Sequence, residues 1–210
     1  MGNIVDDIRA NEDTFADRPF NEVDSLALAQ LSYARMPVNV PRLDAEATDV
    51  DLAMVGVRDL LRAECYDDMF GKVWSPSMNV DLLRAMCESP RWRDLRVGGY
   101  VDEFDPETTK QFSACVFDVG DGSSYVAFRG TDSTIVGWKE DFAMAFRRPV
   151  AAQESAARYL ADIAGRRDGP LMVGGHSKGG NLAVYAAANA PAAVQERLIA
   201  VFCHDGPGFD

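Results

Sequence analysis

Residues 171–189, which read LMVGGHSKGGNLAVYAAAN, decide the fold. The apolar run at 171–173 predicts a strand, the glycines around Ser177 a sharp turn, and the alanine-rich stretch a helix. The pattern Gly175-x-Ser177-x-Gly179 has the form of a nucleophile elbow, in which a serine with a strained backbone stands at the top of a sheet. Glycines are needed two residues on either side because a Cβ there would meet the neighbouring strand or the following helix.

Two plainer interpretations of this stretch are a glycine-rich turn with an idle serine and a cradle for phosphate. A phosphate loop has the spacing G-x-x-x-x-G-K-[ST], whereas Lys178 follows the serine instead of preceding it. The elbow is the favoured interpretation because the motif and its predicted strand and helix agree.

Composition restricts the class of protein and its partners. The chain has 210 residues and a formal net charge of −12, which suits one domain with a substantial core and disfavours binding to nucleic acid or anionic bilayers. The N-terminus lacks the basic and apolar parts of a secretory signal, and no apolar stretch is long enough to span a membrane. Four scattered cysteines without nearby histidines indicate reduced thiols in a cytoplasmic protein, with no metal, cofactor or disulfide framework: Cys65, Cys87, Cys115 and Cys203.

The remaining chain predicts helices first and strands later. Residues 1–18 are polar and aperiodic and are expected to fray, and 1–94 form a helical segment that packs on an α/β-hydrolase core at 95–210, in one domain. The expected helices lie at 21–34, within 50–64, from 79 or 80 to 87, and at 151–164. The expected strands lie at 95–104, 111–119, 124–128, 171–173 and 198–203, with a hairpin turn at 120–122 and a parallel pair around the elbow.

A second chemical stretch, VAFRGTD at 126–132, ends a strand and begins a loop. Ester hydrolysis through a serine needs two hydrogen-bond donors for the developing oxyanion, one of which is the backbone N–H of Lys178. Thr131 is suited to be the other because it offers both an N–H and a hydroxyl, while Gly130 permits close approach of the backbone. Without the elbow, FRGT would be interpreted as an ordinary turn.

Large apolar side chains follow at 134–149. Trp138, Phe142 and Phe146 fall on one helix face, which favours core packing and, as the sharper alternative, an acyl-binding wall or lid. Trp138 and Phe142 are therefore the candidate substrate-binding residues.

These motifs carry a family resemblance. FRGT, Trp138, Asp141 and GHSKGGNLA resemble the class 3 lipase group of α/β-hydrolases, and WKEDF, GHSKGGN and DGPGF resemble still more closely a bacterial, lipase-like group of uncharacterised proteins. The resemblance implies a mostly parallel α/β-hydrolase sheet flanked by helices, with Ser177 as nucleophile and Thr131 and Lys178 as oxyanion donors. Members of that group continue past DGPGF with further strands, so the sheet is expected to lack its C-terminal strands in this chain.

A serine nucleophile also needs a base and an orienting carboxylate, which in this fold follow it in the order acid, then histidine. His176 adjoins the serine on a tight turn and is expected to have a packing role. His204 is the weaker candidate for the base because it neighbours Asp205, and adjacent side chains diverge. Asp205 is the better-placed candidate acid, although an Asp-Gly-Pro-Gly turn explains it equally well. The base and acid are therefore expected beyond residue 210.

Three functions remain open from the sequence. The first is a carboxylic ester hydrolase that acts on a lipid or a small acyl ester through an acyl-enzyme at Ser177. The second is a catalytically silent α/β-hydrolase scaffold that binds a ligand or partner, and the third is a thioesterase or peptidase. The strand at 198–203 has an apolar edge without charge or proline, which predicts self-association through this strand.

Overall fold

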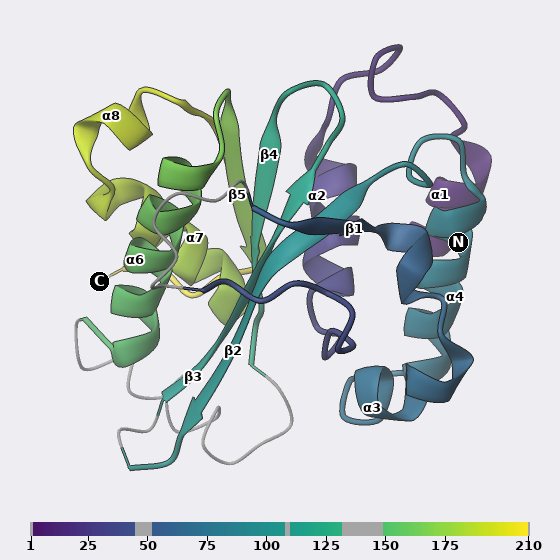
Figure 1. The fold of residues 1–210 in the computed structure, drawn as a ribbon, viewed down its shortest axis with the longest axis horizontal. Coiled ribbons are helices and arrows are strands. Elements are labelled where there is room, and N and C mark those ends of the chain that lie inside the picture. The colour runs from purple at the N-terminus through teal and green to yellow at the C-terminus, as the bar shows by residue number, and fades with distance from the viewer. Residues whose placement is uncertain (1, 45–51, 108–109, 132–148, 210) are drawn as a thin grey trace.

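A computed structural model describes residues 2–44, 52–107, 110–131 and 149–209. One six-stranded sheet separates two groups of helices, as Figure 1 shows, with α6 and α7 on one face and α1, α2 and α4 on the other. The protein is thus an α/β fold with helices on both faces of a mixed sheet. The helices are α1 (Ile4–Ala10), α2 (Glu22–Leu31), α3 (Tyr66–Phe70), α4 (Pro76–Glu88), α6 (Ala151–Arg166), α7 (Lys178–Asn189) and α8 (Ala192–Gln195). The strands are β1 (Met54–Gly56), β2 (Arg96–Asp105), β3 (Lys110–Asp118), β4 (Ser124–Phe128), β5 (Leu171–His176) and β6 (Leu198–His204).

The strands lie in the sheet in their order along the chain. β1 to β4 pair antiparallel, and β4, β5 and β6 pair parallel. Gly120 and Gly122 both have positive φ in the tight connection of β3 to β4, which a side chain would oppose. The five predicted strands, their hairpin and the parallel pair are therefore confirmed. The expectation of a mostly parallel sheet is wrong, because three of the five strand pairings among the described residues are antiparallel.

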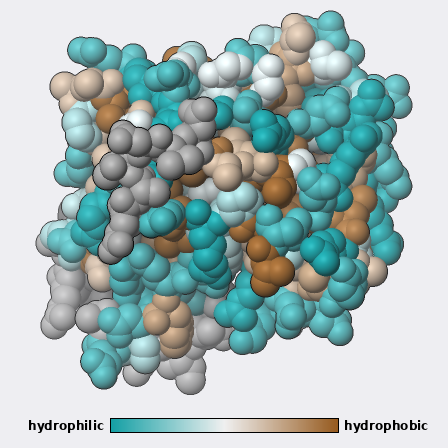
Figure 2. Space-filling view, in the orientation of Figure 1, coloured by the Kyte–Doolittle hydropathy of each residue, from teal (hydrophilic) through white to brown (hydrophobic). Residues whose placement is uncertain are grey.

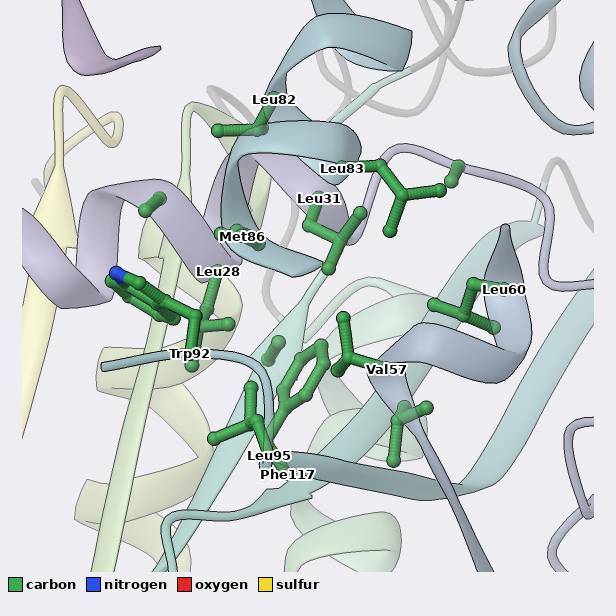
Figure 3. Close-up of a cluster of buried hydrophobic side chains, with 14 of the residues drawn as sticks. Leu28, Leu31, Val57, Leu60, Leu82, Leu83, Met86, Trp92, Leu95 and Phe117 are labelled. Atoms are coloured by element: carbon green, nitrogen blue, oxygen red, sulfur yellow. The ribbon is translucent and has the colours of Figure 1, made fainter. Parts of the chain in front are cut away.

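Each face of the sheet has its own buried core. On the α2 and α4 side, Leu28, Leu31, Met86 and Trp92 pack with Phe117 of β3, in the cluster drawn in Figure 3. On the other side, α6 and α7 cover a second cluster of apolar side chains from β3, β4 and β5. Because both faces are covered, the central strands β3 and β4 are buried on both sides instead of alternating between buried and exposed residues.

A buried ion pair fixes α2 to the chain after α4. The Arg91 guanidinium donates to both carboxylate oxygens of Asp24 at 2.8 and 2.5 Å, and to the backbone carbonyls of residues 13, 14, 18 and 19. A charge this deeply buried requires such complete pairing. Figure 2 shows hydrophilic residues over most of the visible surface, as expected for an acidic chain.

The predicted helix after Asn21 is confirmed as α2. Asn21 caps it by accepting from the N–H groups of Val23 and Asp24, and the Asp24 carboxylate accepts from the Asn21 N–H in return. The predicted helix at 79–87 is confirmed as α4, but it begins earlier because Pro76 occupies its first turn, where no N–H is required. The helix predicted at 151–164 is α6.

The expectation of a frayed N-terminus at 1–18 is wrong. Residues Ile4–Ala10 form α1, which Asn3 caps reciprocally with Asp6. Val5 and Ile8 are buried, and α1 packs against α4. The helix is short, so tertiary burial and its cap stabilise it where helical periodicity is too brief to detect.

The helix predicted within 50–64 is also wrong for the described residues from 52 onward. Met54–Gly56 form the edge strand β1, which pairs with Arg96–Gly98 of β2, and 3-10 turns follow at Val57–Leu60 and Ala63–Cys65. Val57 and Leu60 are fully buried. The helix was predicted from an apolar stripe of Leu52, Val55, Leu60 and Leu61, which do not share one buried face, since Leu61 is 41 % exposed beside the buried Leu60.

Strand β6 is the last described strand of the sheet, which agrees with the prediction that the strand at 198–203 has an apolar edge. Its residues alternate between half-buried and exposed, with Ile199 63 % and Val201 43 % exposed. Among the described residues, no strand pairs with its outer edge.

Candidate functional site

The predicted chemical residues gather where three parallel strands end. Since β4, β5 and β6 run parallel, their carboxyl ends meet at one edge of the sheet. Thr131 follows β4, Ser177 follows β5, and Asp205 follows β6. Thr131 and Asp205, more than seventy positions apart in the sequence, therefore lie at the same edge of the sheet as Ser177.

Ser177 occupies a strained turn between β5 and α7. Its φ is 55° and its ψ is −127°, a combination that costs a non-glycine residue about 1–3 kcal/mol. The backbone around it enforces this geometry: its N–H donates to the His204 carbonyl at 2.8 Å, and its carbonyl accepts from the N–H of Gly180 at 2.9 Å. The half-buried Ser177 hydroxyl makes no hydrogen bond to another residue of the described chain.

Glycines permit the close backbone contacts around the turn. A Cβ on Gly175 would lie 2.5 Å from the Phe128 carbonyl oxygen, and one on Gly179 would lie 2.1 Å from the same atom. A Cβ on Gly130 would lie 2.0 Å from the Tyr33 hydroxyl and 2.7 Å from the His176 carbonyl oxygen. These distances support the steric reason for glycine at each position.

Lys178 begins α7, directly after the serine, and its side chain is 1 % exposed. Its Nζ donates to the Gln111 carbonyl of β3 at 2.8 Å. The ammonium is thus held inside the protein by a structural hydrogen bond. Thr131 is half-buried and directly follows Gly130.

Arg129, the arginine of FRGT, has a structural partner that the sequence did not suggest. Its guanidinium donates to the Asp102 carboxylate of β2 at 3.0 Å, and both side chains are largely buried. Arg35 approaches the same carboxylate at 3.5 Å. The pair fixes the end of β4 against β2, next to Gly130.

The side chain of His176 turns toward the face of the sheet that α2 covers. Its Nδ1 forms a hydrogen bond with the Tyr33 hydroxyl at 3.0 Å. Tyr33 directly follows the C-cap of α2 and lies 143 positions earlier in the chain, so no local pattern could reveal the contact.

His204 points to the same face, opposite His176 in the register of β5 and β6. Its Nε2 lies 2.9 Å from the Ser25 hydroxyl, which in turn lies 2.8 Å from the Tyr125 hydroxyl. Burial, and secondarily the charge of nearby His176, lower the pKa of His204, and burial raises the pKa of Tyr125. Within the described chain, neither imidazole forms a hydrogen bond with the Ser177 hydroxyl.

Asp205 is exposed and has a φ of 53°. The segment that follows it is pinned to α7, because the Asn181 side-chain amide donates to the Pro207 carbonyl at 2.9 Å. Gln153 of α6 donates to the Asn181 side-chain oxygen at 2.9 Å. Asn181 and Gln153 are thus buried structural residues that the sequence analysis missed.

Several candidates have no role that the structure describes. Trp138 and Phe142 lie outside the described residues. Within the described ranges, no three His, Cys, Asp or Glu side chains group as metal ligands, and no helix is long and apolar enough to cross a membrane. The four cysteines are free thiols, of which Cys203 is exposed.

Comparisons with known proteins identify the family of this sequence. No curated protein and no solved structure matches the chain. The sequence model of the Mbeg1-like family matches residues 86–210, from the last turn of α4 through β6. That match contains the elbow, FRGT and DGPGF, and it covers more than half of the chain. The protein therefore belongs to the Mbeg1-like family, a family similar to the class 3 lipases.

Proposed function

We propose that the protein is a serine hydrolase of the α/β-hydrolase type that cleaves carboxylic esters through an acyl-enzyme at Ser177. The observation that carries this proposal is the strained φ and ψ of Ser177 at a turn from a parallel strand to a helix. Strain of this kind persists where the surroundings enforce it, and it clusters at catalytic positions.

In this reaction the Ser177 oxygen attacks the carbonyl carbon of the ester. The ester C–O bond breaks, and the serine proton leaves with the alcohol. Water then hydrolyses the acyl-serine and regenerates the hydroxyl. The backbone N–H of Lys178 and the N–H and hydroxyl of Thr131 are the proposed donors to the oxyanion of both steps.

Asp205 at the end of β6 is the proposed acid, and His204 is the weaker candidate for the base. The contact of His204 Nε2 with Ser25 keeps this ring on the α2 side, so deprotonation of Ser177 by His204 would require a different rotamer. Without a base in contact, turnover by this chain should be slow, since the oxyanion hole and binding alone give ~10³–10⁴-fold catalysis over water.

A second candidate function is a catalytically silent scaffold that binds a ligand. The bonding of both histidines to hydroxyl groups from other elements, instead of to Ser177, favours it. The two functions differ in whether Ser177 becomes acylated.

Acylation can be measured with p-nitrophenyl butyrate, whose leaving group departs without protonation. We expect an acyl adduct on the peptide that contains Ser177, and we expect Thr131→Ala to slow its formation about 100-fold because one oxyanion donor is lost. Thr14→Ala, on the surface near the N-terminus, is the control and should leave the rate unchanged. If Ser177 remains unmodified while the ester is consumed, the hydrolase proposal fails and the scaffold is favoured.

A further inference from the structure

An apolar groove lies on the α2 side of the sheet, beside the elbow. Its walls come from α1, α2 and the start of α4, and its volume is about 330 Å³. Six apolar side chains line it: Ile4, Val5, Leu26, Trp74, Met78 and Leu82. No Asp, Glu, Lys or Arg lines it, although the whole chain is 26 % charged.

The two side-chain amides in the groove donate hydrogen bonds within the protein. The Gln30 amide donates to the Asn79 side-chain oxygen at 2.8 Å. The Asn79 amide donates in turn to the Trp74 carbonyl at 2.8 Å and to the Ser75 carbonyl at 3.1 Å. A hydrocarbon chain in the groove would therefore leave these donors satisfied, which removes the usual penalty for apolar contact with polar walls.

The groove reaches the elbow at one lining residue. His176, which immediately precedes Ser177, contributes to the lining. Exposed apolar residues mark its mouth, where Trp74 is 86 % and Met78 47 % exposed. A contiguous apolar surface of this kind is typical of a binding site.

A second hollow, which Tyr33 lines, is charged where the groove is apolar. Five charged side chains line it: Arg35, Asp68, Lys72, Asp102 and Arg129. Tyr33 lines this charged hollow and bonds to His176 of the apolar groove, so the two hollows meet at this pair. Of the two, only the groove suits a hydrocarbon.

We propose that the groove binds the hydrocarbon chain of the acyl ester whose carbonyl Ser177 attacks. This inference rests on the proposed function and specifies its substrate class as esters with an extended alkyl chain. Apart from His176, every lining residue precedes residue 86 and so lies outside the family match. The N-terminal helices of this chain thus supply the chain-binding site, and the family-matched sheet supplies the serine.

Binding is tested without catalysis by using 2-alkanones from 2-heptanone to 2-undecanone, uncharged ketones that cannot be hydrolysed. Calorimetry on the native chain and on Ser177→Ala should show affinity rising about fourfold per methylene until the groove is filled. Met78→Glu and Leu26→Glu place a charge at the mouth and should abolish this dependence on chain length. Leu61→Glu is the matched control, because Leu61 is a similarly exposed leucine that does not line the groove, and it should retain the dependence.

Other outcomes overturn the proposal. If Met78→Glu keeps the native chain-length dependence, another surface binds the alkanones. If Trp74 fluorescence responds to phosphatidylcholine vesicles and not to 2-undecanone, the groove docks on a bilayer instead. Failure of the serine hydrolase is distinguishable, because the alkanones would then still bind while Ser177 resists acylation.

Discussion

Two serines of the described chain, Ser177 and Ser75, have a positive φ and stand directly before a helix, yet only Ser177 is held at the end of a parallel strand. Ser75 precedes α4 with φ 51° and ψ 68°, the ordinary left-handed region, and is exposed. Ser177 precedes α7 with φ 55° and ψ −127° and is half-buried at the end of a parallel strand between tightly packed glycines. A serine with positive φ therefore also occurs in an exposed local turn, and Ser177 differs because a parallel strand and tightly packed glycines hold it.

The tight packing of glycines around Ser177 should produce the largest effect on stability. Gly179→Ala places a Cβ 2.1 Å from the Phe128 carbonyl oxygen, so the backbone must shift, and the free energy of unfolding should fall by about 3 kcal/mol. Gly165→Ala in α6 meets no atom within 4 Å and should raise it by about 0.5–1 kcal/mol. Urea denaturation measures both, and equal stabilities would contradict the proposed steric role of Gly179.

Ser177 lies beside β6, the last described strand of the sheet, whereas Ser75 lies in a loop before α4. We expect the chain to self-associate through β6, since Ile199 and Val201 are exposed and no strand of the described residues pairs with its outer edge. Val201→Lys should shift the sedimentation coefficient to that of a monomer, whereas Val38→Lys, at a fully exposed valine away from the sheet, should not. A native chain that sediments as a monomer at micromolar concentration would disprove the association.

Replacement by glycine should separate strain from function at the two serines. Ser177→Gly should stabilise the protein by about 1 kcal/mol, because glycine tolerates this φ and ψ, and Ser75→Gly should stabilise it by a few tenths. Only Ser177→Gly should abolish acylation by p-nitrophenyl butyrate. A Ser75→Gly variant that also loses acylation would remove the distinction between the two turns.

The smallest expected effect concerns pH and the histidine behind the elbow. Burial and the charge of His176 lower the pKa of His204 below its ordinary value of 6.5, so the unfolded chain binds the proton more readily. Stability from neutral His204 is present above about pH 6.5 and is lost as the pH falls toward the folded pKa. Thermal melting between about pH 7 and 5 should show this loss, and His204→Gln should reduce it. An unchanged pH profile in the variant would assign the loss to other groups.

The sheet was largely predictable from the sequence because its signals are local. Apolar runs, the Gly-Asp-Gly turn and the Asn21 cap each identify an element within a few residues. The short helix α1 and the three-residue strand β1 were missed because neither is long enough to show its period, and both depend on tertiary contacts. The contacts of His176 with Tyr33 and of His204 with Ser25 join residues 143 and 179 positions apart, beyond the reach of any local pattern.

The central claim is that Ser177, and not merely a strained serine, is activated. Treatment of the native chain with an ethyl fluorophosphonate, followed by digestion and mass spectrometry, tests this claim most directly. We predict an adduct on the peptide with Ser177 and none on the peptide with Ser75, abolished by Ser177→Ala and retained in Ser75→Ala. An adduct found only on other serines, or formed equally at Ser75 and Ser177, would contradict the assignment of the elbow as a catalytic site.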